Sequence, residues 1–412
     1  MDVDADVVVV GAGLAGLSCA REVERAGRRA IVLEAADGVG GRVRTDVVDG
    51  FQLDRGFQIL LTAYPEVARQ LDVDALDLRP FDPGSLVWTG SRLQRVADPL
   101  RRPTALASTA LADVGSIGDK VRIGLLRQRL VHRDPVALLR APDRTTADAL
   151  RDAGFTPKVV ERFFRPLLGG IQLDLDLESS ARMFEVIFRT LAVGDAAVPA
   201  AGMRAIPDQL AAGLGEGTVR LGARVERLDG TGAVLADGTT VRGRAVVVAT
   251  EGPAAAGLAG VRDPGSKAVS ALWFTAPEPP VRGRAIVLDG ARSGPVANVA
   301  VHSEVAPSYA PDGRALFVAA CPGAEAPGLE AAARAQLTGW FGASAADWEL
   351  VRHDRIAHGQ PLASVPFSPK RRVALGDGRY VAGDHRDTPS IQGALFSGRR
   401  CAEAVLADLA AS

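Results

Sequence analysis

Residues 7–16, which read VVVVGAGLAG, constrain the fold more than any other stretch of the sequence. Four successive valines are typical of a strand that is buried on both faces, as in a parallel sheet. Gly11, Gly13 and Gly16 then follow in the G-x-G-x-x-G spacing. This spacing allows a tight turn, close backbone approach to a pyrophosphate, and close packing of a helix on a strand. The free N–H groups at the start of that helix favour the same anion, so the stretch predicts a dinucleotide-binding turn.

The residues around this turn complete a nucleotide-binding βαβ pattern. Residues 14–27 carry apolar side chains at helical spacing and end in a glycine, which is a good helix stop. Residues 28–34 read as a second strand, and Glu34 at its end lies 23 positions after Gly11. A carboxylate at about this distance binds ribose hydroxyls, and its charge disfavours a 2′-phosphate. These residues leave NAD and FAD as open alternatives.

The overall composition argues against several classes of protein. A length of 412 residues with 47% hydrophobic content predicts two domains, or one domain with a large insertion. The net charge of −1 gives no reason to expect a nucleic acid partner. Cys19, Cys321 and Cys401 share no spacing typical of a metal site or a disulfide framework, so we expect no metal. The N-terminus lacks a basic region and the chain lacks a long apolar run, so we expect a cytoplasmic protein.

A second glycine motif follows Glu34 and bears on the choice of dinucleotide. Gly40, Gly41 and Arg42 offer a further close approach of the backbone and a cation for phosphate. An ordinary surface turn is the alternative interpretation. The motif alone therefore does not decide between the two cofactors.

The C-terminal region favours a flavin. Residues 380–382 read as a short buried strand, followed by Gly383 and Asp384 and by a helix that begins near Ser390 or Ile391. An aspartate at a strand end suits a polyhydroxyl chain such as ribitol. A helix N-terminus aimed at a flavin would stabilise negative charge on the reduced ring. The alternative is an amphipathic helix that merely closes the domain.

Both ends of the chain resemble a known family. GAGLAGL…VLEAADGVGGRVRT and VAGDHRDTPSIQGALFSGRRCAEAV are similar to the FAD-binding signatures of the flavin amine oxidase and phytoene desaturase superfamily, which includes protoporphyrinogen oxidase. The C-terminal signature together with DRGFQILLTAYP is closer to a bacterial and plastid-type branch than to any member with a settled substrate. The resemblance is specific at the two ends and weaker between them.

The resemblance implies FAD as the cofactor and assigns roles residue by residue. The residues implied for the ADP half are Gly11, Gly13, Ala15, Gly16, Glu34, Gly41 and Arg42, with Val225 beside the adenine and Thr250 close to the dinucleotide. Those implied for the flavin half are Gly56, Phe57, Gly383, Asp384, Ile391 and Gln392, the last two through their backbone. No second strand-turn-helix glycine motif occurs mid-chain, so a separate NAD(P)H domain is not expected.

The resemblance also implies an α/β fold with a p-hydroxybenzoate-hydroxylase-like two-domain layout. The motif positions predict a discontinuous Rossmann-like FAD-binding domain made of residues 1–62, 196–264 and 362–412. Residues 63–195 and 265–361 would form a mixed α+β substrate domain. We expect the first insert to be largely helical, with a capping box at Ser116 and Asp119, and the second to be a β meander.

The first insert also suggests a membrane partner. Its arginines Arg122, Arg127, Arg129 and Arg133 could hold the protein on an anionic membrane surface. A solvated helix face is the favoured interpretation of so short a run.

Catalytic residues are hard to identify, because flavin chemistry needs little from the protein beyond positioning. Lys267 is the first candidate, since amine oxidases use a lysine in this strand region; a surface lysine is the favoured alternative. His385 follows Asp384 and is either catalytic or structural. Gln58 lies where relatives place residues beside the ring, and positioning is the favoured role.

One departure from the amine oxidase pattern shapes the functional prediction. The tyrosine that precedes the position of Ile391 in amine oxidases is replaced here by Ser390, so the aromatic cage for an amine is at least half missing. We therefore predict two-electron dehydrogenation or isomerisation of an apolar small molecule, such as a polyene or terpenoid. An amine or amino-acid oxidase and a non-catalytic FAD-carrying protein are the alternatives. The sequence does not identify the electron acceptor.

Overall fold

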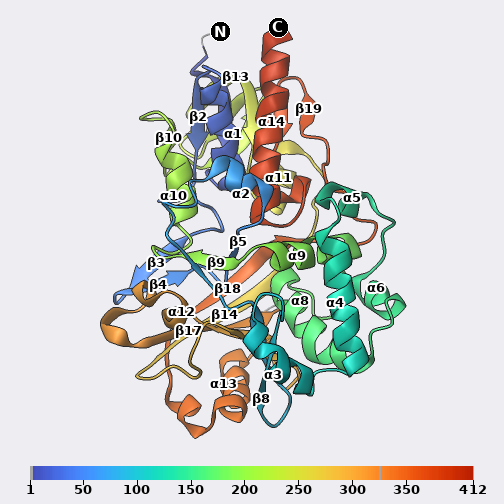
Figure 1. The fold of residues 1–412 in the computed structure, drawn as a ribbon. Coiled ribbons are helices and arrows are strands. Elements are labelled where there is room, and N and C mark those ends of the chain that lie inside the picture. The colour runs from blue at the N-terminus through green and yellow to red at the C-terminus, as the bar shows by residue number, and fades with distance from the viewer. Residues whose placement is uncertain (1–2, 324–325, 412) are drawn as a thin grey trace.

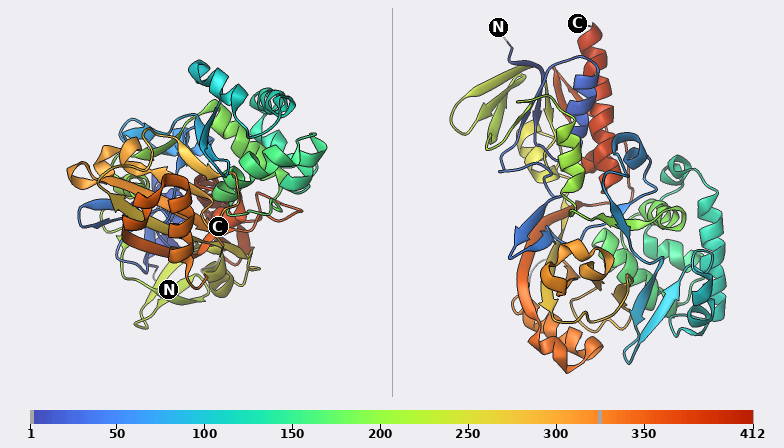
Figure 2. Two further views of the ribbon diagram at one scale, coloured as in Figure 1. Left: turned by 90° about the horizontal axis from the view of Figure 1, so that it is seen from below. Right: turned by 60° about the vertical axis from the view of Figure 1, so that its left-hand side comes forward.

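The computed structural model describes residues 3–323 and 326–411, which form two lobes connected by several crossing segments (Figure 1). Both termini lie at the far end of one lobe, as the right-hand view of Figure 2 also shows. The outermost limits of the predicted FAD domain, residues 1 and 412, lie outside the described residues. We call the lobe with the termini the cofactor lobe and the other the substrate lobe.

The cofactor lobe is built on an eight-stranded sheet. Its parallel part has the order β10-β2-β1-β13-β20, and β19 and the β12–β11 hairpin add antiparallel strands. The strands are β1 (Ala5–Val10), β2 (Ala30–Leu33), β10 (Val219–Arg220), β11 (Val225–Asp229), β12 (Gly232–Leu235), β13 (Thr240–Val248), β19 (Ala374–Gly376) and β20 (Arg379–Val381). The valines of β1 are buried on both faces, as the sequence predicts.

Helices cover one face of this sheet. They are α1 (Leu14–Arg25), α2 (Pro65–Gln70), α10 (Ala205–Ala212) and α14 (Ile391–Ala411), whereas α11 (Gly252–Ala259) lies on the opposite face. α1 and α14 lie side by side in Figure 1, and they pack so closely that a Cβ on Gly398 would lie 2.1 Å from the carbonyl oxygen of Ala15. The predicted start of the last helix near Ile391 is confirmed. The opposite face packs against the β11–β12 hairpin and part of α11.

The substrate lobe contains a seven-stranded sheet in the order β18-β14-β17-β16-β15-β7-β8. Its strands are β7 (Gly84–Trp88), β8 (Leu93–Ala97), β14 (Ser266–Ala276), β15 (Ile286–Asp289), β16 (Asn298–Val301), β17 (Ala315–Pro322) and β18 (Glu349–Pro361). One face packs against α13 (Leu329–Phe341) through a core that includes Trp340 and Trp348. The other face forms part of a cavity wall.

One detail of the predicted substrate domain is wrong. The second insert is not a meander, because β14 pairs with β17 and β18 rather than with its neighbour along the chain. The first insert is largely helical, as expected, and it also contributes the β7–β8 hairpin, which joins the sheet through a parallel pairing of β7 with β15. Both findings concern pairing between distant segments, which local alternation of apolar residues does not specify.

Helices cover the cavity side of this sheet. They are α3 (Leu106–Leu111), α4 (Ile117–Val131), α5 (Pro135–Arg140), α6 (Thr146–Asp152), α7 (Pro157–Val159), a π turn (Val160–Phe164), α8 (Arg165–Gln172) and α9 (Ala181–Val193). The capping box of α4 is confirmed: the Ser116 hydroxyl accepts from the Asp119 N–H, and the Asp119 carboxylate accepts from the Ser116 N–H. A core of leucines and phenylalanines holds α4, α8 and α9 together.

Short elements cross between the lobes. They are the hairpin β3 (Thr45–Val48) and β4 (Phe51–Asp54), and the small sheet of β5 (Leu60–Leu61), β6 (Leu78–Pro80) and β9 (Ala196–Pro199). The remaining regular pieces are α12 (His302–Val305) and 3₁₀ turns at Pro103–Ala105, Pro307–Tyr309, Pro311–Gly313, Ala343–Asp347 and Asp384–Arg386. Within residues 3–323 and 326–411, no helix has the length and hydropathy of a membrane span.

Candidate functional site

A cavity of about 1140 Å³ runs from the cofactor lobe into the substrate lobe. Residues from both ends of the sequence line its first half, and residues of the two inserts line the second. Thirteen of the fifteen predicted cofactor-binding residues lie on its wall: Gly11, Gly13, Ala15, Glu34, Gly41, Arg42, Gly56, Phe57, Val225, Thr250, Gly383, Asp384 and Ile391. The sequence therefore predicts most of one half of this cavity.

The glycine turn has the geometry that a pyrophosphate requires. Gly11 has a φ of +104°, which L side chains rarely adopt. A Cβ on Gly16 would lie 1.9 Å from the carbonyl oxygen of Gly11, so its role is the close packing of α1 on the turn, away from the cavity surface. Gly13 caps α1 without a side-chain hydrogen bond, which leaves the N–H groups of the first turn open to an anion.

Glu34 lies at the end of β2, where the cavity meets the glycine turn. Glu34 is only 9% exposed, and its carboxylate accepts hydrogen bonds from the N–H groups of Ala12 (2.7 Å) and Ala36 (2.9 Å). These bonds fix the carboxylate in place while leaving further lone pairs for ribose hydroxyls. The predicted ribose ligand is thus held at the cavity wall by the backbone of the turn itself.

Thr250 adds an independent sign of a polar ligand. It follows β13, lines the cavity beside Val225 of β11, and its hydroxyl is buried without a hydrogen-bond partner in the described part of the chain. A buried hydroxyl is normally satisfied, and an orphaned one on a cavity wall fits a bound polar group. The residues present therefore fit the ADP portion of a dinucleotide.

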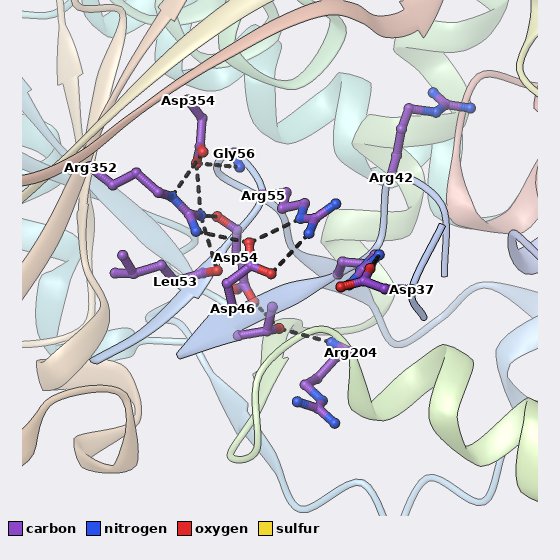
Figure 3. Close-up of polar contacts among 12 residues, drawn as sticks. Asp37, Arg42, Asp46, Leu53, Asp54, Arg55, Gly56, Arg204, Arg352 and Asp354 are labelled. Carbon is purple, nitrogen blue, oxygen red and sulfur yellow. Dashed lines mark hydrogen bonds and ion pairs between the residues drawn. The ribbon is translucent and has the colours of Figure 1, made fainter. Parts of the chain in front are cut away.

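Arg42 and Asp384 meet at the middle of the cavity, although 342 positions separate them. The Arg42 guanidinium donates to the Asp384 carboxylate (2.7 Å) and to the carbonyl oxygen of Gly359 in β18 (2.8 Å). Figure 3 shows the Arg42 side chain directed away from the carboxylates of Asp46 and Asp354. The pair joins the two FAD signatures of the sequence to a strand of the substrate lobe.

Gln392 is, with Gly16, one of the two predicted cofactor residues that do not line the cavity. Ile391 lines the cavity at the start of α14, whereas the side-chain oxygen of Gln392 accepts from the N–H of Glu66 in α2 (2.9 Å). The side chain of Gln392 thus anchors α2 to α14. A backbone contact of either residue with the pyrimidine ring stays a prediction.

The loop after β4 carries Arg55, Gly56, Phe57 and Gln58 to the cavity. The Gln58 amide donates to the carbonyl oxygens of Arg42 (2.7 Å) and Arg55 (2.8 Å), so it holds this loop against the second glycine motif. This geometry supports the positioning role that we favour for Gln58. Its catalytic role stays a prediction.

A charged cluster behind this loop was missed by the sequence analysis (Figure 3). Arg55 binds Asp46 through two hydrogen bonds of 3.0 Å, and Arg352 of β18 binds both Asp46 (3.0 Å) and Asp354 (2.8 Å). Asp354 also accepts from the N–H of Gly56 (3.1 Å). The cluster fixes the loop to the substrate sheet, and only pairing of segments about 300 positions apart creates it.

Asp54 is a second missed residue, buried at the same junction. It accepts hydrogen bonds from Thr45, from the N–H of Met203 (3.0 Å) and from the Tyr309 hydroxyl (3.0 Å). Burial raises the pKa of Asp54 to about 6, although these hydrogen bonds act in the opposite direction. Asp54 thus joins β4 to segments of both lobes.

Lys267 lies in the cavity wall at the start of β14 and is not a surface lysine. Its ammonium donates to Ser179 (2.6 Å) and to the carbonyl oxygen of Gln172 (3.2 Å), and it pairs with Asp174 (3.2 Å). Burial lowers the pKa of Lys267, and Asp174 opposes this shift. These three partners occupy the donors of the ammonium, so the geometry favours fastening β14 to the segment after α8. The catalytic role stays a prediction.

His385 is buried just behind the cavity and is not part of its lining. Its ring lies against Gly383, where a Cβ would come within 2.4 Å of it. Both ring nitrogens are without a hydrogen-bond partner in the described chain, and burial lowers the pKa of His385 to about 4, so the ring is neutral at pH 7. This position disfavours the predicted catalytic role and favours a packing role beside Asp384.

The substrate half of the cavity is lined mainly by apolar side chains, together with a set of polar and charged ones. The apolar side chains that line it from the helices are Leu106, Ile117, Val121, Ile123, Phe163, Leu167, Ile171, Met183, Ile187, Phe188 and Leu191, and the sheet adds Val269, Ile286, Leu288 and Ala320. The polar and charged residues of the two inserts on its wall are Asp82, Ser85, Asp98, Arg101, Thr109, Lys120, Arg127, Gln172, Ser179, Asp195, Lys267, Asn298 and Gln360. Among these, the carbonyl oxygen of Asn298 in β16 is buried without a partner in the described chain.

Ser390, which stands where amine oxidases place a tyrosine, uses its hydroxyl for hydrogen bonds with residues close to it in the sequence. It accepts from the N–H of Gly393 (3.1 Å) and lies 3.0 Å from the Thr388 hydroxyl, while Tyr64 approaches from the end of β5. Burial raises the pKa of Tyr64 to about 12. Tyr64 is the one tyrosine of the three in the chain that lines the cavity.

This fold and cavity define a two-domain FAD-binding oxidoreductase. Residues 14–406 match the model of the flavin-containing amine oxidoreductase family, so the chain belongs to this family and its cofactor is FAD. The family resemblance expected from the sequence is confirmed.

Individual relatives differ in what their names say they oxidise. The chain is 31% identical over 172 residues to coproporphyrinogen III oxidase of Propionibacterium freudenreichii subsp. freudenreichii, which covers 40% of this chain and 31% of that protein. It is 47% identical over 70 residues to putrescine oxidase of Kocuria rosea, covering 17% and 15%. The matches thus span less than a third of either relative.

A solved structure supports the fold over the whole chain. An oxidoreductase from Methanosarcina mazei superposes with a TM-score of 0.72 at 18% identity, covering 96% of this chain and 99% of that one. At this identity the likeness shows the shared two-domain fold and leaves the substrate open.

Proposed function

We propose that this FAD-dependent oxidoreductase carries out two-electron dehydrogenation or isomerisation of an apolar small molecule, such as a polyene or terpenoid. The observation that supports the proposal is the lining of the substrate half, where apolar side chains from the helices and the sheet make up most of the wall. Transfer of an apolar ligand into such a site is favourable by about 25 cal/mol for each Å² of apolar surface removed from water.

The protein's own residues would bind, orient and isolate the substrate. FAD, when bound, supplies a two-electron acceptor. Apolar side chains of α8 and α9 on one side and of β14 and β17 on the other would hold the substrate in a dry space, which excludes water from the reacting carbon. Phe57 and Tyr64 line the cavity near the FAD residues and would limit how the substrate approaches.

An amine or amino-acid oxidase is the second candidate, because Lys267 does lie in the cavity wall. Two features weigh against it. The Lys267 ammonium is fastened to Asp174, Ser179 and Gln172, and Ser390 stands where the cage tyrosine would be. The carboxylate that contacts Lys267, that of Asp174, is already paired with the lysine and is therefore not free to bind a cationic substrate.

An anaerobic reduction screen tests the proposal. The holoenzyme is mixed with polyene, porphyrinogen and amine panels, and bleaching of the flavin absorption band is recorded. Reduction by a polyene or terpenoid supports the proposal. Reduction by amines alone would replace it with the second candidate. Because isomerisation leaves no net reduced flavin, the products are also analysed, and neither reduction nor an isomerised product with any panel would favour a non-catalytic FAD carrier.

A further inference from the structure

Exposed apolar side chains gather at one place on the substrate lobe. Of the twelve large apolar side chains that are exposed in the described chain, six lie between residues 100 and 125. They are Leu100 (70% exposed), Leu106 (59%), Leu111 (83%), Ile117 (76%), Val121 (57%) and Leu125 (65%). We call these six residues the apolar rim. A concentration of this kind marks a binding surface rather than the scattered exposure normal for a protein.

The helices of the rim explain why these side chains point outward. Ile117, Val121 and Leu125 recur every four residues on α4, so they form one stripe along the helix. The opposite side of α4 carries Leu126 and Leu130, which are buried in the helical core. α4 therefore has two apolar sides, and one of them has no protein packed against it.

Half of the rim residues also belong to the wall of the substrate half of the cavity. Leu106, Ile117 and Val121 belong to the rim and also line the cavity. The Lys120 ammonium donates to the carbonyl oxygens of Ala110 (2.6 Å) and Ala112 (2.8 Å), which ties α4 to the end of α3. Figure 1 shows α3 and α4 on the substrate lobe, away from the two termini. An apolar path thus continues from the surface into the site.

Basic residues are concentrated around the rim, and two of them are left without a partner in the part of the chain that the structure describes. Residues 99–133 contain seven lysines and arginines and two carboxylates. Four of the arginines are paired with carboxylates outside this range: Arg101 with Asp195, Arg102 with Asp82, Arg127 with Asp98 and Arg129 with Glu185. The exposed side chains of Arg122 and Arg133 make no hydrogen bond or ion pair within the described chain. These two arginines are therefore available to an anionic partner.

We propose that the apolar rim docks the protein on an anionic lipid surface and that substrate enters the cavity from the bilayer. Leucines inserted at the headgroup boundary with flanking arginines are what interfacial binding requires. A second copy of the chain fits less well, since a symmetric contact would bring the same cationic residues of both copies together. Binding is measured without substrate, so failure of this inference would leave the proposed function standing.

Vesicle flotation of the holoenzyme tests the inference. Wild-type protein should float with phosphatidylglycerol/phosphatidylcholine vesicles at low salt and much less with pure phosphatidylcholine. The triple variant Leu100→Ser, Leu111→Ser, Leu125→Ser changes rim residues outside the cavity lining and should lower the partition coefficient at least about tenfold. The matched control Val47→Ser, Leu221→Ser removes two exposed apolar side chains elsewhere and should float like wild type.

Three results would overturn the inference. They are wild-type protein that stays unbound, a triple variant that floats like wild type, and a wild-type dimer that the triple variant converts to a monomer without any vesicle binding. FAD content checks that each variant is folded. If the triple variant loses FAD, the double variant Arg122→Glu, Arg133→Glu takes its place as the test. This double variant should abolish the preference for anionic vesicles, and an unchanged preference refutes the proposal.

Discussion

The FAD half and the substrate half of the cavity differ in how their walls are made. The FAD half consists of backbone turns and a few fixed charges, among them the Gly11 turn, Glu34 and the Arg42–Asp384 pair. The substrate half is lined mainly by apolar side chains from helices and strands, with polar and charged side chains of the two inserts among them. The first surface recognises one defined set of polar groups, whereas the second recognises mainly shape and hydrophobicity. Changes in the two halves should therefore have separable effects.

Glu34→Arg should give the largest effect and should affect the FAD half alone. The change removes the carboxylate of a residue that is 9% exposed and places a cation where ribose hydroxyls need an acceptor. Loss of a charged hydrogen bond costs about 1.5–3 kcal/mol, which is more than tenfold in affinity. The measurement is the Kd for FAD, with Glu226→Arg on the exposed side of β11 as the control. Unchanged affinity in folded Glu34→Arg would mean that Glu34 is not the ribose ligand.

The sequence predicts the FAD half well for a physical reason. Its ligands are specified locally: a turn needs Gly11 and Gly16 wherever the chain lies, and Glu34 is fixed by its distance along one βαβ unit. The substrate half depends on pairing between distant segments. The β7–β8 hairpin, Asn298 in the cavity wall and the Arg352–Asp46 bond each require the assembled fold, and no local pattern signals them.

Lys267 shows the same limit on a single residue. From its position in a predicted strand, Lys267 is expected either in a cavity wall or on the protein surface. The partners that decide its role come from residues 172–179. Burial of the ammonium could be inferred only once α8 and β14 were placed together. A sequence pattern therefore identifies a candidate residue, and the hydrogen bonds that this residue makes in the assembled fold define what it can do.

Asp54→Asn tests the junction between the two halves. The pKa of Asp54 is raised to about 6 in the folded protein, above its ordinary value, so the native state binds the proton more tightly than the unfolded state. Its contribution to stability is present at low pH and is lost as the pH rises through about 6. Between pH 4 and pH 7, the difference between the unfolding free energies of wild type and Asp54→Asn should change by on the order of 2 kcal/mol. A difference independent of pH between 4 and 7 would show that Asp54 does not titrate there.

Lys267→Met should have a smaller effect on chemistry. The substitution keeps the length of the side chain and removes the charge. If the substrate is apolar, its anaerobic reduction of the flavin should change by less than about tenfold, or 1.4 kcal/mol of barrier. Asp174→Asn is the matched variant, because it removes the other member of the pair. A loss of several orders of magnitude in Lys267→Met with FAD still bound would restore the lysine-dependent oxidase.

Asn298→Leu should have the smallest effect and should sharpen the boundary between the two halves. The Asn298 carbonyl oxygen is buried without a partner in the described chain, and an unsatisfied buried acceptor costs about 1–3 kcal/mol. Leucine is similar in size and removes this cost, so the free energy of unfolding should rise by about 1 kcal/mol. Because Asn298 lies among apolar residues of the sheet, the Kd for FAD should stay within about twofold. Chemical denaturation and FAD titration measure the two quantities, with Val299→Leu on the opposite face of β16 as the control. A Kd for FAD raised tenfold or more would show that the FAD half extends to β16 and that Asn298 does not belong to the substrate half of the cavity.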